Sequence, residues 1–200
     1  MDLGSVRGHH AGPSQPSQRV LGIDPGTVIT GWGVVEMVEG SILHLAHGTI
    51  GSSGSRGLAS RLSRIYHGLQ EVLTRYEPQG ISLEKVFFAR NAQSALKLGQ
   101  ARGVAMLAAA ERDIAIHEYA SAEIKLAVVG YGQATKEQVQ KMVASLLHLS
   151  GKIPGDAADA LAAAICYLHQ CAFHTRVMGA LPAGRQAVLP SKMARDKVIR

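Results

Sequence analysis

Short apolar runs near the start of the chain indicate three consecutive strands. Residues 19–24 form a continuous apolar run of the kind found in buried strands, and residues 31–40 and 41–50 alternate between apolar and polar side chains. Pro25 and Gly26 turn the chain after the first run, and a Gly–Ser pair indicates a tight hairpin between the other two. The pattern therefore predicts an antiparallel meander of three strands.

After this meander, segments with helical spacing alternate with short strand-like runs. Apolar residues three and four apart predict a helix over 58–76, which Pro78 ends. Further strands are expected at 81–87 and 113–119, and further helices at 91–112, 121–130, 134–149 and from 155 onward. Asn91 and Thr135 are suited to cap the first and third of these helices. The order predicts an α/β fold with a mixed five-stranded sheet and helices on both faces.

The helix at 91–112 is apolar on more than one side. The positions expected to face inward are Ala95, Leu98, Val104, Leu107 and Ala108. Gly99 and Gly103 lie four residues apart, a spacing that lets another element approach closely, and the charges of Lys97 and Arg102 argue against a membrane partner. That other element is either the sheet of the same chain or a second subunit.

The two ends of the chain differ in composition from the part between them. Residues 1–18 are rich in Gly, Ser, Pro and Gln, which predicts a disordered N-terminal extension. Residues 19–174 are expected to form one domain. Residues 175–200 carry six basic side chains against Asp196 alone, which predicts a disordered basic tail. Such a tail can contact a polyanion or be merely solvated, and charge alone leaves both open.

Overall composition excludes several classes of protein. Hydrophobic residues make up 46% of the chain and charged residues 18%, as in ordinary soluble domains. No run approaches the roughly 18 apolar residues that span a bilayer, and the N-terminus lacks the apolar segment of a secretory signal. Cys166 and Cys171 are the only cysteines, too few for a disulfide framework. A cytoplasmic location, with no membrane partner, is therefore expected.

Two acidic residues stand at unusual places in the strand pattern. Asp24 ends the first apolar strand, where an unpaired buried carboxylate would be costly. The alternative is a turn-initiating aspartate that bonds to the backbone ahead of it. Glu84 interrupts the strand at 81–87, both faces of which should be covered. Its alternative is a position near the strand end that has already reached solvent.

Two more acids, Asp156 and Asp159, lie three residues apart at the start of the last helix and so share a face. Acids in a first turn also complement the helix dipole, and Asp156 is a possible N-cap, so a structural role stays open. The residues that follow are small and apolar, however, so the helix should be buried and Asp159 would need a cation or a ligand.

Together the four acids predict a site for hard divalent ions. A cluster of carboxylates repels itself unless cations neutralise it, and oxygen-only ligands select ions such as Mg²⁺ or Mn²⁺. Two such ions about 4 Å apart can activate water and stabilise the leaving oxygen in a phosphoryl displacement. The acids expected to gather in this site are Asp24, Glu84, Asp156 and Asp159.

Four separated motifs, at 19–35, 81–110, 118–143 and 155–169, resemble the RuvC family of bacterial Holliday-junction resolvases, in the same order. The resemblance implies a ribonuclease-H-like fold and a cytoplasmic, Mg²⁺-dependent homodimer. It implies binding to a four-way DNA junction, paired nicks in opposing strands that leave 5′-phosphate and 3′-hydroxyl ends, and work with the branch-migration proteins RuvA and RuvB. Val28 departs from the basic or polar residue expected there, and the N-terminal extension has no counterpart.

The resemblance also assigns roles to single residues. The metal-binding and catalytic acids of the family fall on Asp24, Glu84, Asp156 and Asp159. Its basic residues near the scissile phosphate, which are catalytic and bind DNA, fall on Lys125 and Lys136. Its aromatic residue against unstacked junction bases falls on Phe87, and Arg90 is near enough in sequence to serve a phosphate. Solvated lysines, a core phenylalanine and a surface arginine are the corresponding structural alternatives.

Two other functions fit parts of the sequence. The turn at 22–27 resembles the phosphate-binding hairpin of actin-like and sugar-kinase-like ATPases, although two such lobes need roughly twice this length. A non-catalytic junction-binding module is the other alternative, against which the intact set of four acids argues. The favoured reading is a junction-resolving endonuclease in which a lysine, Lys125 or Lys136, stabilises charge in the transition state.

Overall fold

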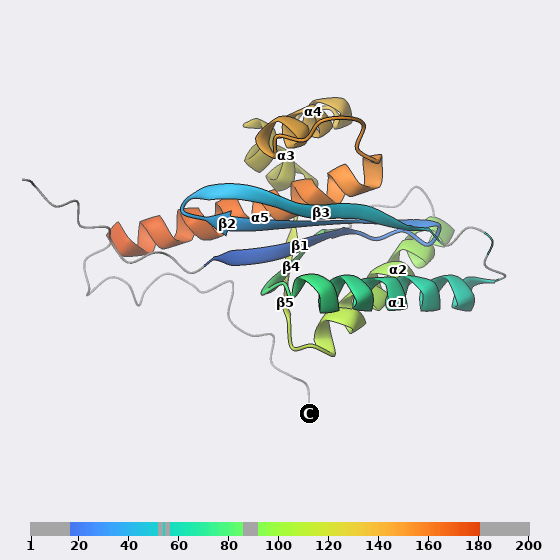
Figure 1. Cartoon of the computed structure of the whole chain (residues 1–200). Helices are drawn as coiled ribbons and strands as arrows, with labels where there is room; N and C mark the ends of the chain where they lie inside the picture. Colours follow the sequence, from blue (N-terminus) through green and yellow to red (C-terminus); the bar gives the residue numbers. More distant parts are fainter. Residues whose placement is uncertain (1–16, 52–53, 55–56, 86–91, 181–200) are drawn as a thin grey trace, which may run out of the picture.

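A five-stranded mixed sheet lies between two layers of helices (Figure 1). This computed structural model describes residues 17–51, 54, 57–85 and 92–180, and for 175–180 only the backbone. The strands are β1 Gln18–Asp24, β2 Ile29–Val38, β3 Ser41–Gly51, β4 Gly80–Glu84 and β5 Ala115–Tyr119, in the sheet order β3-β2-β1-β4-β5. The meander β1-β2-β3 is antiparallel, whereas β4 runs parallel to both β1 and β5.

Helices cover both faces of this sheet. They are α1 Leu58–Tyr76, α2 Ala92–Ala110, α3 Ser121–Val129, α4 Lys136–Leu146 and α5 Gly155–Ala180. In Figure 1, α5 crosses one face with α3 and α4 packed on it, and α1 and α2 lie on the other face. The element order and the mixed sheet with helices on both faces, predicted from the sequence, are confirmed. No helix in the described part of the chain is long and apolar enough to span a bilayer.

The ends of the domain differ from the boundaries expected from composition. β1 begins at Gln18, inside the expected N-terminal extension, and α5 continues to Ala180, past position 174. The expectation of disorder from 175 onward was therefore wrong for 175–180. From Gly155 onward the first proline is Pro182, so no residue before it lacks the N–H that helical hydrogen bonding needs. Residues 1–16 and 181–200 lie outside the described residues.

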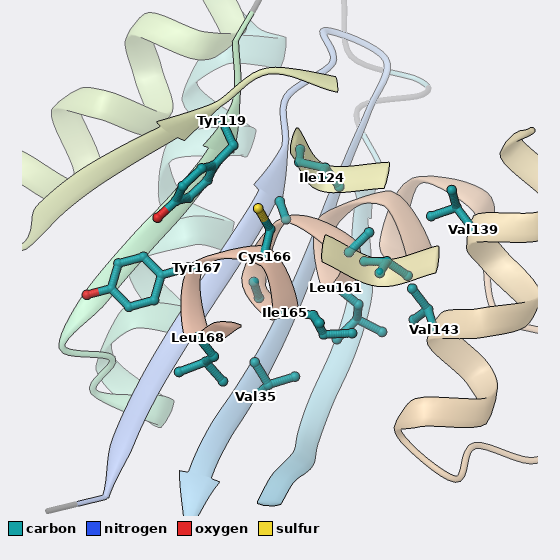
Figure 2. Close-up of a cluster of buried hydrophobic side chains, with 14 of the residues drawn as sticks. Val35, Tyr119, Ile124, Val139, Val143, Leu161, Ile165, Cys166, Tyr167 and Leu168 are labelled. Atoms are coloured by element: carbon teal, nitrogen blue, oxygen red, sulfur yellow. The ribbon is translucent and has the colours of Figure 1, made fainter. Parts of the chain in front are cut away.

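Small residues let α5 lie close to the sheet. A methyl group at Gly22 would overlap the main-chain carbonyl of Ala160, and one at Gly33 would overlap Leu161. Around this contact, larger side chains fill the space between α3, α4, α5 and the sheet (Figure 2). The largest fully buried side chains that α5 contributes are Leu161, Ile165 and Leu168. Truncating such a leucine typically costs about 2–5 kcal/mol, so this layer holds α5 in one place.

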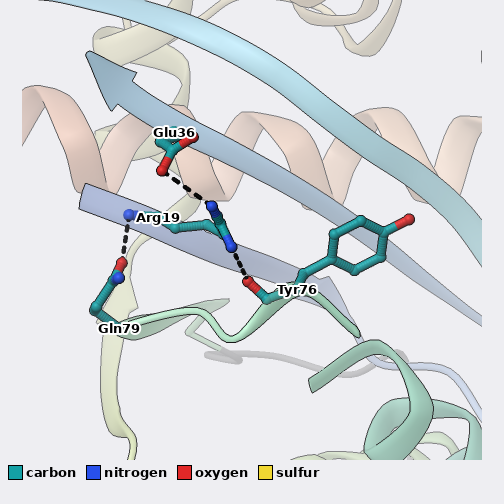
Figure 3. Close-up of polar contacts among 4 residues, drawn as sticks. All are labelled: Arg19, Glu36, Tyr76 and Gln79. Carbon is teal, nitrogen blue, oxygen red and sulfur yellow. Dashed lines mark hydrogen bonds and ion pairs between the residues drawn. The ribbon is translucent and has the colours of Figure 1, made fainter. Parts of the chain in front are cut away.

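Arg19 ties the sheet to α1 at the end of β1 that is remote from Asp24 (Figure 3). Its guanidinium donates to the main-chain carbonyl of Tyr76 at 2.5 Å and pairs with Glu36 at 3.2 Å. Its backbone N–H donates to the side chain of Gln79, just before β4. These contacts set the start of β4 beside the start of β1, so the carboxyl ends of the two strands also meet.

The buried face of α2 differs in part from the one expected, because Ala108 alone of the five predicted inward positions is fully buried. Ala101, Ala105, Ala108 and Ala109 are its buried residues. The predicted inward position Leu107 is 53% exposed, Ala95 is exposed, and Leu98 and Val104 are half-buried. Because α2 is apolar on more than one side, periodicity could not tell which stripe would meet α1. A methyl group at Gly99 or Gly103 would meet no described atom within 4 Å, so these glycines do not pack against the sheet.

Candidate active site

Two acidic residues come together at the carboxyl ends of adjacent parallel strands. β1 ends at Asp24 and β4 at Glu84, and Ile23 lies beside Leu83 in the register. Alternation turns Ile23 and Leu83 into the α1–α2 core, so both acids lie on the opposite face, the one that α5 covers. Strand ends of this kind are where α/β sheets usually place ligands.

The start of α5 brings the other two acids to the same edge. Asp156 lies in the first turn of α5 and Asp159 one turn further along, and both side chains are half-buried. Gly31 pairs with Asp24 in the β1–β2 ladder, and a methyl group at Gly31 would overlap the main-chain carbonyl of Asp156. The absence of a side chain on β2 therefore allows α5 to begin beside Asp24.

The pKa of Asp24 records how closely the acids gather. Burial, followed by the charges of Asp159, Asp156 and Glu84 in that order, raises this pKa to about 7. Within the described part of the chain, the charge of Lys136 opposes the rise. A carboxyl group that is half-protonated near neutral pH lacks enough positive charge around it. The site therefore favours the arrival of a cation.

Lys136 supplies part of the missing charge. Its ammonium nitrogen lies 2.5 Å from a carboxylate oxygen of Asp159, and this hydrogen bond is the main reason why its pKa is raised. Lys136 is the first residue of α4, and the preceding Thr135 caps the helix through a capping box with Gln138. The cap predicted from the sequence is thus confirmed. It fixes the start of α4 and therefore the position of Lys136.

A pocket of about 280 Å³ joins the lysines to the acids. It is lined by Glu84, Ser121, Ile124, Lys125, Lys136, Val139, Asp159 and Ala162. Lys125 reaches it from α3, Lys136 from α4 and Asp159 from α5. The two lysines singled out from the sequence therefore share one cavity with two of the four acids, and three apolar residues complete much of its lining.

The donor set fits a hard divalent ion in its chemistry. All four acids offer oxygen, the donor that Mg²⁺ and Mn²⁺ prefer, and the raised pKa of Asp24 shows an unbalanced cluster. As the side chains stand, no three His, Cys, Asp or Glu residues within the described ranges are close enough to hold a metal ion. Coordination would therefore require carboxylates such as that of Asp159, now paired with Lys136, to turn toward the ion.

Two predicted DNA contacts and two unpredicted supports complete the account of the site. Phe87 and Arg90 lie outside the described residues.

Thr30, fully buried, donates a 2.8 Å hydrogen bond to the carbonyl of Gly26 and so closes the turn after Asp24. Arg102 donates from α2 to the main-chain carbonyl of Glu84 at 2.8 Å. A positive charge in the more apolar second half of the helix was the only sequence signal for Arg102.

A mixed sheet of this order, with helices on both faces, defines a ribonuclease-H-like protein, and the four acids lie at the ends of β1 and β4 and near the start of α5. The family model described as crossover junction endodeoxyribonuclease RuvC matches residues 20–167. The chain belongs to this RuvC family.

Individual relatives agree with this assignment. RuvC of Syntrophotalea carbinolica is 52% identical over 151 residues, which cover 76% of this chain and 94% of that protein. RuvC of Geobacter metallireducens is 51% identical over 149 residues, 74% of this chain and 91% of that protein. A solved structure of Thermus thermophilus RuvC in complex with Holliday junction substrate superposes with a TM-score of 0.74. The two sequences are 34% identical, and the match covers 79% of this chain and 97% of the Thermus chain.

Proposed function

We propose that this protein resolves four-way DNA junctions as a metal-dependent endodeoxyribonuclease. The observation that carries the proposal is the gathering of four acids around Asp24 at one sheet edge, beside a pocket that holds Lys125 and Lys136. Family membership supports the substrate, since a relative that matches over 97% of its own chain has been solved with a Holliday junction. It also argues against the ATPase alternative.

The acids would hold the metal. Asp24, Glu84, Asp156 and Asp159 would bind two Mg²⁺ ions, for which Mn²⁺ would substitute. When bound, such a pair of ions supplies Lewis-acid activation of water and stabilisation of the leaving oxygen. Asp24 is central to the set because the other three acids all act on its pKa. With divalent ions present, Asp24 would stay ionised at neutral pH.

The lysines would act on the phosphate. Lys136 and Lys125 line the pocket beside Glu84 and Asp159, so a phosphodiester at this edge would meet both ammonium groups. Positive charge placed there before the reaction stabilises the negative charge that develops on the phosphoryl oxygens. Attack of water on phosphorus with departure of the 3′-oxygen would leave 5′-phosphate and 3′-hydroxyl ends, which a ligase can join.

Symmetric cleavage of two opposing strands requires two active sites, so we propose that the protein acts as a homodimer. The exposed apolar side of α2 suits a subunit interface, because Leu96, Met106 and Leu107 are 67%, 41% and 53% exposed. Gly99 and Gly103 on the same helix leave open space that a second helix would fill. In the cytoplasm of a bacterium, RuvA and RuvB would deliver the junction during recombination and repair.

The test is a synthetic mobile Holliday junction incubated with the wild-type protein and with Asp24→Asn. The wild type should make paired nicks with Mg²⁺ or Mn²⁺, and EDTA should abolish cleavage while junction binding remains. Asp24→Asn should bind the junction without cutting it. Cleavage by Asp24→Asn at the wild-type rate would remove Asp24 from the site. Binding without metal-dependent cleavage by the wild type would favour the non-catalytic module.

A further inference from the structure

Arg102 makes a two-pronged contact at the ends of β4 and β5. One nitrogen of its guanidinium donates to the main-chain carbonyl of Glu84 at 2.8 Å, and another forms an ion pair with the carboxylate of Glu118. The side chain of Arg102 is only 17% exposed, and the Glu118 oxygen that it meets is buried. The Glu118 side chain as a whole is 36% exposed, so only its contact oxygen and the Arg102 guanidinium are shielded from water, and screening of the pair is reduced there.

The end of β4 has a particular need for such a donor. After β1 ends at Asp24, the next residue of the chain is Pro25, which has no N–H to offer a neighbouring strand. On the other side, the N–H of Lys85 donates to the carbonyl of Tyr119 on β5 at 2.7 Å. The carbonyl of Glu84 receives its hydrogen bond from Arg102 instead. The last residue of β4 is thus held by β5 and by α2 together.

The position of Arg102 on its helix makes this reach direct. Its neighbour Ala101 and the next-turn residue Ala105 are buried against the α1 side of the core, so α2 is fixed where Arg102 departs from it. Glu118 pairs with Leu83 in the β4–β5 register, one residue before Glu84. The guanidinium therefore spans from one strand end to the next, a task for which its planar fork is suited and a lysine is not.

We propose that Arg102, braced by Glu118, is a positioning residue that holds the Glu84 carboxylate where the metal binds. The inference rests on the proposed function, in which Glu84 is a metal ligand. In this role Arg102 acts through Glu84 and does not bind the metal or DNA itself, because it fixes the backbone from which Glu84 projects. Partners behind metal ligands commonly change metal affinity or activity by about 10–100-fold when they are removed.

An ion pair that only stabilises the fold would give a different result, and the chain offers a matched control. Arg112, just after α2, donates to the side chains of Gln70 at 2.7 Å and Thr74 at 2.6 Å. These contacts tie the α2 end to α1 without approaching the acids. Arg112→Gln should therefore lower stability because hydrogen bonds between α2 and α1 are lost, and it should leave metal binding unchanged.

The experiment compares Arg102→Gln, Arg102→Lys, Glu118→Gln and Arg112→Gln with the wild type. In the metal-free protein, NMR hydrogen exchange of the Lys85 amide reports on the end of β4. Without DNA, the rise in melting temperature on adding Mn²⁺ reports on metal binding. With junction DNA, the Mg²⁺ concentration at half-maximal cleavage and the affinity in EDTA separate metal binding from DNA binding.

For Arg102→Gln we expect faster exchange at Lys85, a smaller Mn²⁺-induced rise in melting temperature, and a Mg²⁺ midpoint raised roughly tenfold or more. Junction affinity in EDTA should not change. Arg102→Lys, which keeps the charge without the fork, and Glu118→Gln should fall between this variant and the wild type. These two variants decide the question by themselves if Arg102→Gln does not fold.

The inference is overturned if the Arg102 variants keep the wild-type Lys85 exchange and metal midpoint, or if Arg112→Gln shifts both equally. Failure of the proposed function looks different. A wild-type protein with no metal-dependent rise in melting temperature and no cleavage would refute the metal site. The Lys85 exchange in metal-free protein would still show whether Arg102 holds the end of β4.

Discussion

The main-chain carbonyl of Asp156 lies so close to Gly31 that any larger residue at position 31 would overlap it. The missing side chain on β2 leaves space for the main-chain carbonyl at the start of α5. Because Gly31 is the ladder partner of Asp24, this one contact sets the distance between the acid on β1 and the acids on α5. The geometry of the site therefore depends on a glycine, which has no side-chain functional group.

Substitution Gly31→Ala should damage both stability and cleavage. The added methyl group must displace the backbone of α5, and overpacking of this kind costs about 1–3 kcal/mol. Thermal or denaturant unfolding should show the loss, and junction cleavage should fall further because Asp156 moves away from Asp24. Gly51→Ala on β3, where a methyl group meets nothing within 4 Å, is the control. Equal stability of the two variants would show that α5 yields without cost.

The charge of Asp24 should destabilise the metal-free protein as pH rises. Its pKa is raised to about 7 in the fold, above the value of 3.8 for an unperturbed carboxyl. The folded state therefore binds the Asp24 proton more tightly than the unfolded state does. As pH rises from about 4 to 7, the unfolded state ionises first, so the free energy of unfolding falls. A shift of this size corresponds to an upper estimate of about 4 kcal/mol.

Asp24→Asn should accordingly stabilise the metal-free protein at pH 8 and have little effect at pH 4. Urea unfolding of both proteins in EDTA at the two pH values measures the difference. With excess Mg²⁺ at pH 8 the order should reverse, because the ion stabilises only the intact set of acids. An Asp24→Asn variant that is less stable than the wild type in EDTA at pH 8 would contradict the raised pKa.

Removal of the Lys136 charge should slow cleavage more than it weakens binding. The ammonium group pairs with Asp159 in the acid pocket, where preorganised charge typically contributes about 10²–10³ in rate. Single-turnover cleavage by Lys136→Gln, at saturating junction concentration, measures this loss. Lys141→Gln, an exposed position later in α4, should cut at nearly the wild-type rate. Similar rates for the two variants would reduce Lys136 to a surface charge.

The exposed side of α2 should carry the dimer. Leu107→Glu places a charge on a side chain that is 53% exposed in the single chain and would be buried between two copies. Analytical ultracentrifugation should show a monomer, and paired nicking should become single nicking. Phe173→Glu, at a residue of α5 that is 66% exposed, should remain dimeric. A dimeric Leu107→Glu protein would place the interface elsewhere.

Local patterns in the sequence were enough to determine the order of elements. Strand and helix periods depend on neighbouring residues, so the meander, the alternation that follows it and the cap at Thr135 were all predictable. The acids were also identifiable, because Asp24 ends an apolar strand and Glu84 interrupts another. What each acid faces was not predictable, and each kept a structural alternative of its own.

Tertiary structure decided which of these residues meet. The parallel pairing of β1 with β4 puts Asp24 beside Glu84, and the packing of α4 on α5 puts Lys136 against Asp159. It also decided which apolar stripe of α2 is buried, and brought Arg102 to the carbonyl of Glu84. These are contacts between segments far apart in the chain, set by strand pairing and close packing across glycines. No local period encodes them, so only the assembled fold shows them.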